Sequence, residues 1–205
     1  MENIQNSPQD LDMNEFWAVS GDNGGLAKAC KYVARIHPRG SLLSEYSDIA
    51  RDLVYLCEVA EFPGRGFQSV DIRYYGPNFK MPYQTSYEDI TMTYLCRSES
   101  LEREFFDDWL TYINPNNTWD FNYRDDYNAD IEIFQYSESD ETAKYAYTIF
   151  DAYPMIVNPQ TVSWADDQFL RLSVTFTYRN WKRRGRDPEF RSTEPNGQSF
   201  NLVNR

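Results

Sequence analysis

Three adjacent pairs of carboxylates are the part of this chain that comes nearest to a catalytic constellation. They are Asp107 with Asp108, Asp125 with Asp126, and Asp166 with Asp167. Two carboxylates at a suitable separation are what glycoside hydrolysis requires. Neighbouring residues of a helix or loop point in different directions, however, so we interpret these pairs as solvated surface charge.

The histidine and the cysteines do not suggest a reactive centre either. His37, the single histidine of the sequence, has no acid or nucleophile at a matching spacing for acid–base work. Cys30, Cys57 and Cys96 are odd in number, far apart and without a CxxC motif, so neither a disulfide framework nor a zinc site is indicated. We expect reduced core cysteines of a protein folded in a cytoplasm, with no catalytic residues, no metal and no cofactor.

The net charge of the chain narrows the classes of partner that it can be expected to bind. The chain has 32 Asp and Glu against 20 Lys and Arg, a formal net charge of −12. So acidic a chain gains no counterion-release affinity from a phosphate backbone, which argues against a protein that grips DNA. Acids that line a pore would instead let nucleic acid pass without sticking.

The elements expected from the pattern are mostly strands. Alternation and turn residues predict strands at 29–37, 56–61, 66–75, 79–83, 88–96, 129–136, 144–152 and 169–178. Apolar residues at every fourth position predict a helix over 98–113, and a weaker pattern predicts a short one over 44–56. The expected fold is mainly β: an antiparallel sandwich or barrel-like subunit with one flanking helix.

The 205 residues suit one domain with polar ends. We expect a flexible arm over 1–27, a β domain over 28–182 and a tail over 183–205. The arm either docks in an assembly or is a plain disordered terminus. It has no cationic start and no apolar run, and no stretch approaches the roughly 18 apolar residues of a membrane helix, so neither a secretory signal nor a membrane is expected.

A basic run follows the last predicted strand: Lys182, Arg183, Arg184 and Arg186. It is either a solvated strand end or a patch that pairs with an acidic face of another copy of the chain, which would assist stacking.

Four stretches carry a resemblance to a known family. They are CEVAEFPG at 57–64, VDIRYYGPNFKMPY at 70–83 with YEDITMT at 87–93, EFFDDWLTYI at 104–113, and YRDDYNADIEIFQY at 123–136 with LRLSVTFTYRNW at 170–181. Their order over about three quarters of the chain resembles the tail tube proteins of contractile-tailed, T-even-like bacteriophages, which are related to the inner tube protein of type VI secretion.

The resemblance implies a structural virion protein whose subunits close into hexameric rings. The rings stack into a tube that conducts DNA, with tail sheath and baseplate proteins as partners and assembly in the host bacterial cytoplasm. The longer arm, an apparent insertion at 39–54 and the C-terminal tail depart from a minimal tube subunit. They leave open a baseplate tube initiator of the same fold.

Two further sets of residues, beside the basic run, are candidates for these roles. The hairpin tip is the candidate inter-subunit contact, unless the hairpin folds back on its own core: Tyr75, Gly76, Pro77, Asn78 and Phe79. The candidate lumen acids alternate with apolar residues, although the same pattern fits an ordinary outer surface: Asp89, Asp130 and Glu132.

A rival class stays open. A monomeric β-sandwich that binds or cleaves sugar would use Trp119, Tyr123 and Tyr127 among acids as its platform. It predicts a monomer with a ligand cleft, whereas the tube subunit predicts rings or polymers.

Overall fold

The computed structural model describes residues 21, 26–39, 46–73, 75–136, 143–165 and 167–184. The strands are β1 (Tyr32–Pro38), β2 (Cys57–Ala60), β3 (Gly66–Ile72), β4 (Phe79–Ser86), β5 (Ile90–Leu95), β6 (Ala129–Tyr136), β7 (Ala143–Val157), β8 (Arg171–Thr177) and β9 (Asn180–Arg184). The helices are α3 (Ser47–Leu56), α4 (Leu101–Ile113) and α5 (Arg124–Tyr127).

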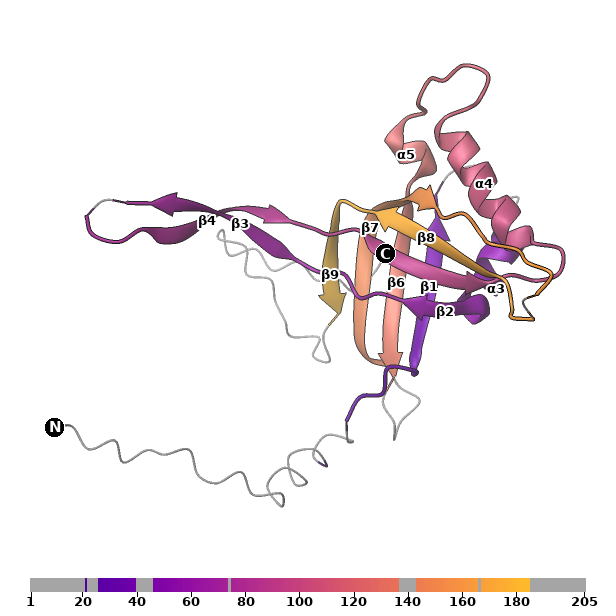
Figure 1. Ribbon diagram of the computed structural model, residues 1–205, viewed down its shortest axis with the longest axis horizontal. Helices are drawn as coiled ribbons and strands as arrows, with labels where there is room; N and C mark the ends of the chain where they lie inside the picture. Colours follow the sequence, from indigo (N-terminus) through magenta and orange to yellow (C-terminus); the bar gives the residue numbers. More distant parts are fainter. Residues whose placement is uncertain are drawn as a thin grey trace, which may run out of the picture.

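One seven-stranded antiparallel sheet folds over into the two layers of a sandwich (Figure 1). Its order is β1-β6-β7-β8-β5-β2, and β9 pairs with β7. The long strand β7 belongs to both layers, because its first half pairs with β6 and β9 and its second half pairs with β8. The change of layer comes at Asp151, whose φ is 54°. The predicted mainly-β, antiparallel class is confirmed.

Strand alternation builds the core between the layers. Residues at every second position are buried on β6, β5 and β8: Ile131, Ile133, Ile90, Met92, Tyr94, Leu172, Val174 and Phe176. The residues between them face outward, as a strand period of two requires. The outer faces of the two layers therefore carry the polar residues.

Helix α4 closes one side of the core with an aromatic stripe. Phe105, Phe106 and Trp109 are buried on it, and the Phe106 ring lies 6.0 Å from Phe176 between centroids. The Trp109 indole N–H donates to the carbonyl of Tyr127 at 2.9 Å, so this buried donor is satisfied. The predicted helix is present, although it begins at Leu101 rather than at residue 98.

A second helix, α3, joins α4, as the weaker pattern over 44–56 predicted, although the expected fold counted one flanking helix. Helix α3 lies in the segment predicted to be an insertion, of which residues 40–45 fall outside the described residues. It buries Ala50 and Leu53, and Leu53 is part of the main core cluster. The described part of this segment is therefore integral to the fold.

Strands β3 and β4 form a separate two-stranded sheet. This hairpin projects from the body of the molecule along its longest axis (Figure 1). It connects β2 to β5, so it leaves the body at the edge of the β8-β5-β2 layer.

The C-terminal strand β9 was not predicted. It extends to Arg184, two residues past the expected end of the β domain, and pairs with β7 from Ala146 to Phe150. The rest of the expected tail, 185–205, lies outside the described residues, as does the expected arm apart from residues 21, 26 and 27.

Candidate functional site

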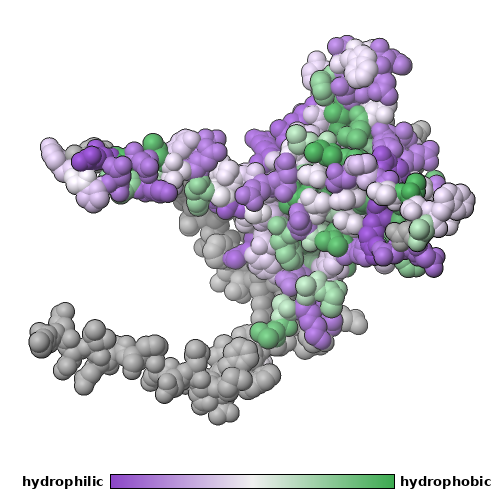
Figure 2. Space-filling view, viewed as in Figure 1, coloured by the Kyte–Doolittle hydropathy of each residue, from purple (hydrophilic) through white to green (hydrophobic). Residues whose placement is uncertain are grey.

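The hairpin carries an apolar face that the register defines. Val70 lies opposite Met81, and Ile72 lies opposite Phe79. Alternate residues of a strand share a face, so these four side chains lie together, and we call them the hairpin face. Val70 is 46% exposed, Phe79 50% and Met81 51%. Figure 2 shows apolar residues among hydrophilic ones along this projection.

The opposite face of the hairpin is more polar. Asp71 lies opposite Lys80 there, and Ser69 lies opposite Pro82. The Arg65 guanidinium lies over the Phe67 ring at 5.2 Å from the centroid. The hairpin therefore has one apolar face and one more polar face, although it projects away from the core.

The predicted contact residues form the exposed tip of this hairpin. All five, from Tyr75 to Phe79, are exposed, and Tyr75 is 98% exposed. Gly76 has a φ of 82°, a conformation that side chains disfavour and that the turn requires. The tip does not fold back on the core. Its contact with another subunit stays a prediction.

Two loops of the body also expose large apolar side chains. The loop between β7 and β8 exposes Val162, Trp164 and Phe169 at 79%, 108% and 80%. The segment between α4 and α5 exposes Trp119 and Phe121, and Tyr123 precedes α5. The proposed sugar platform is incomplete, because Tyr127 is partly buried with its ring 5.5 Å from that of Tyr153.

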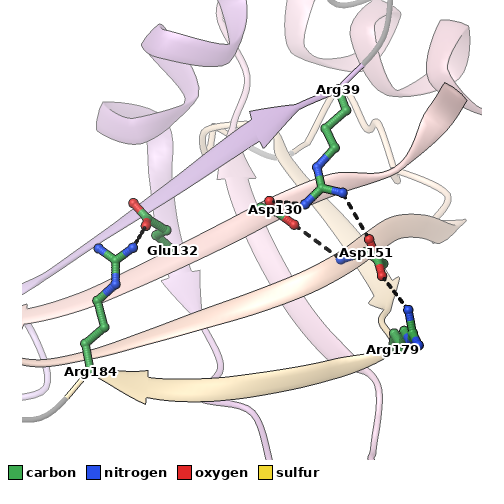
Figure 3. A network of polar contacts seen from close by, with 6 residues as sticks. All are labelled: Arg39, Asp130, Glu132, Asp151, Arg179 and Arg184. Carbon is green, nitrogen blue, oxygen red and sulfur yellow. Dashed lines mark hydrogen bonds and ion pairs between the residues drawn. The ribbon is translucent and has the colours of Figure 1, made fainter. Parts of the chain in front are cut away.

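The outer face of the β1-β6-β7-β9 layer holds a network of charges (Figure 3). Arg39 donates to Asp130 and, at 3.2 Å, to Asp151. The backbone N–H of Asp151 donates to the Asp130 carboxylate at 3.4 Å, and Arg179 lies 3.6 Å from Asp151. The hydrogen bond to Asp130 raises the pKa of Arg39.

Of the three predicted lumen acids, the structure brings two together. Asp130 and Glu132 project from the same face of β6, where Arg184 lies 2.9 Å from Glu132 and His37 lies 3.1 Å from it. Asp89 precedes β5 in the other layer and accepts a hydrogen bond from the Thr177 hydroxyl. Because the outer faces of a sandwich point away from each other, Asp89 does not share a surface with the other two.

The outer face of β5 and β8 is built mainly from hydroxyl side chains. They are Thr91, Thr93, Ser173, Thr175 and Thr177, alternating with buried residues. Carboxylates border this surface. Glu58 accepts two hydrogen bonds from Arg171, at 2.6 and 3.0 Å, which lowers the pKa of Glu58, and Glu61 accepts one from the backbone of Thr91.

The predicted basic patch is divided between two faces of β9. Lys182 and Arg184 lie on the face of Glu132, with Lys182 Nζ 5.8 Å from the Phe150 centroid. Arg183 lies on the other face, with its guanidinium 5.7 Å from the Tyr145 centroid. Arg186 lies outside the described residues. The run therefore does not form one continuous surface.

The first candidate acid pair, Asp107 and Asp108, has separate partners. Asp107 accepts from Arg103 at 2.9 Å, whereas Asp108 accepts from the Tyr46 hydroxyl at 2.5 Å. Asp166 lies outside the described residues.

Burial raises the pKa of the Cys57 thiol to about 11, so this cysteine is not a thiolate at neutral pH.

Within the described part of the chain, no group of three His, Cys, Asp or Glu side chains is placed to hold a metal ion. No helix there has the length and apolarity needed to cross a membrane.

Comparison with solved structures shows the same fold in contractile injection machines. A chain of the sheath/tube terminator of an extracellular contractile injection system (PVC) has a TM-score of 0.58 at 12% identity, covering 78% of this chain and 97% of that chain. A chain of the anti-feeding prophage baseplate has a TM-score of 0.55 at 12% identity, and the match covers 78% of this chain and 97% of that chain. A chain of the PVC sheath–tube complex has a TM-score of 0.54 at 12% identity, and the match covers 82% of this chain and 96% of that chain.

The sequence has no match among curated proteins. A family model described as phage tail tube protein matches residues 27–184, which include every strand described above. The resemblance found in the sequence is thereby confirmed, and the chain belongs to the phage tail tube protein family.

Proposed function

We propose that this protein is the repeating subunit of the inner tube of a contractile phage tail. Its copies close into hexameric rings that stack into a hollow tube, and DNA leaves the capsid through that tube. The role is structural rather than enzymatic. The protein works in the virion after assembly in the host bacterial cytoplasm.

The observation that carries this proposal is the hairpin face. Three of its four side chains are about half exposed on a hairpin that projects from the body. Covering apolar surface releases about 25 cal/mol per Å². A two-stranded hairpin is also marginally stable alone, so a neighbouring copy that covers this face would stabilise it.

Sheath and baseplate proteins are the other proposed partners. Solved chains of similar fold belong to a sheath–tube complex and to a baseplate. Membership of the tail tube family supports the same neighbours for this chain.

We assign the channel to the outer face of β5 and β8. On the other outer face, Asp130 and Glu132 are paired with Arg39 and Arg184, so their charges are compensated. The β5 and β8 face presents uncharged hydroxyls with Asp89 at its border. Phosphate groups would find no cluster of cations to hold them there, which suits the passage of DNA.

The experiment compares two neighbouring carboxylate substitutions in the hairpin. Val70→Asp places a charge on the hairpin face, and Ser69→Asp places the same charge on the opposite face. Negative-stain electron microscopy and light scattering then measure assembly. We expect hollow rings and tubes from the wild type and from Ser69→Asp, and single subunits or isolated rings from Val70→Asp.

Each outcome distinguishes between roles. Tubes from Val70→Asp equal to those of the wild type would overturn the role of the hairpin face. Wild-type rings that never stack would favour the baseplate tube initiator. Single subunits of the wild type at every concentration would contradict a self-assembling tube subunit.

A further inference from the structure

An open stack of identical rings needs two different surfaces that fit each other. A heterologous contact repeats from copy to copy, giving a ring where its rotation closes and a filament where it does not, whereas a self-complementary contact closes after two copies. The hairpin face supplies one of the two surfaces. Its counterpart should be apolar, exposed and at the opposite end of the molecule.

The loop between β7 and β8, residues 158–170, has these properties. In Figure 1 it lies at the end of the longest axis opposite the hairpin. It exposes Val162, Trp164 and Phe169, each by more than three quarters. Exposed tryptophan is a frequent anchor of protein interfaces, because its large ring buries much area with few rotatable bonds.

Hydrogen bonds to the body fix the start of this loop. The Asn158 N–H donates to the Ser173 carbonyl at 2.9 Å, and Arg103 donates to the Asn158 carbonyl at 3.3 Å. The Gln160 amide donates to the Arg171 carbonyl at 3.0 Å. A loop anchored in this way loses less conformational entropy on binding, so it is suited to be a docking surface.

The net charges of the two regions are opposite. Residues 65–86 carry Arg65, Arg73 and Lys80 against one acid, Asp71, and the Asp71–Lys80 pair lies on the side of the hairpin away from the hairpin face. Residues 158–170 contain two acids and no Lys or Arg. The opposite net charges favour the approach of a hairpin to a loop over the approach of two hairpins or two loops, whereas the docked contact itself is apolar.

We propose that the hairpin face of one copy docks on the loop 158–170 of the next copy along the tube, with Trp164 as the anchor. This inference rests on the proposed tube function and names the partner surface of the hairpin. The exposed segment with Trp119 and Phe121 has similar chemistry but does not lie at the end opposite the hairpin (Figure 1). It therefore serves as the control.

The first test uses crosslinking between different copies. Met81→Cys and Ser163→Cys proteins are prepared separately, each with the exposed Cys30 changed to Ser, then mixed and treated with a short bis-maleimide. Ser163 is exposed beside Trp164, so the anchor itself stays in place. We expect mass spectrometry to find the 81–163 crosslink, joining two chains, in the mixture. A Thr118→Cys protein, with its cysteine beside Trp119, should give less than a tenth of that yield in place of Ser163→Cys.

The second test compares two exposed tryptophans. We expect Trp164→Ala to reduce tube length at least tenfold in electron micrographs while rings remain, and Trp119→Ala to leave tube length unchanged. Tubes of the mixed cysteine variants that give no 81–163 crosslink, together with normal tubes from Trp164→Ala, would overturn the docking proposal and leave the tube function intact. Failure of the wild type to form any ring or tube would overturn both.

Discussion

Asp151 places a carboxylate at the point where β7 passes from one layer of the sandwich to the other. Its backbone has positive φ, which Asp and Asn tolerate better than most residues. Arg39 and Arg179 hold the carboxylate, and the backbone N–H donates to Asp130. The bend is therefore stabilised both by its local conformation and by charges from three other segments.

This arrangement predicts graded losses of stability. Asp151→Asn keeps a side chain suited to positive φ but removes the charge, and should lower the unfolding free energy by about 1 kcal/mol because the ion pairs are partly exposed. Asp151→Ala should cost about 1 kcal/mol more, since alanine fits positive φ less well.

Urea unfolding in the Val70→Asp background, at a protein concentration where light scattering shows single subunits, would measure these losses without a contribution from assembly. Asp126→Asn, an exposed acid on α5, is the control and should change little. Equal stability of the Asp151 variants and the wild type would show that the network does not support the bend.

At the residue scale, the sequence predicted which way side chains face but not what they meet. The alternation around Ile131 and Ile133 placed Asp130 and Glu132 together on one polar face. Their partners Arg39 and Arg184 come from β1's end and β9, far away in the chain. The two-residue period of a strand carries no information about ion pairs between distant segments. The neutralisation of the charges of Asp130 and Glu132 was therefore not predictable from the sequence.

At the scale of elements, α4 and the β3–β4 hairpin were predictable because local signals define them. Four-residue spacing marks the buried stripe of α4, and the Gly76 turn marks the hairpin. Strand β9 was missed because its Lys182, Arg183 and Arg184 look like a solvated tail. Its pairing with β7 depends on backbone hydrogen bonds, and charged residues are common on edge strands.

The packing of α4 gives a prediction for an element. Phe106 is fully buried among Tyr94, Phe105, Trp109 and Phe176. Phe106→Ala should therefore lower the unfolding free energy by about 3–5 kcal/mol. Phe121→Ala makes the same change at an exposed site and should stay within about 0.5 kcal/mol of the wild type.

Denaturant unfolding with the two variants side by side measures the difference. A loss for Phe106→Ala no larger than that for Phe121→Ala would mean that α4 is not packed on the sheet as described.

At the scale of the whole molecule, the order of sequence stretches was enough to recognise the family. The same order was not enough to predict where the exposed surfaces of the hairpin and of the loop 158–170 lie on the folded molecule. Residues 70–81 and 158–170 are separated in sequence, and their positions at opposite ends follow from how the layers fold. The separation of Asp89 from Asp130 likewise follows from the two-layer architecture, which alternation alone does not specify.

A cryo-EM reconstruction of the particles formed by the purified protein tests directly whether copies of this chain build a hollow tube. We expect stacked hexameric rings around an open channel, with the Thr175 and Asp89 surface lining the channel and each hairpin resting on the loop of the next copy. Particles without a channel, or a preparation that contains single subunits at every concentration, would contradict this expectation.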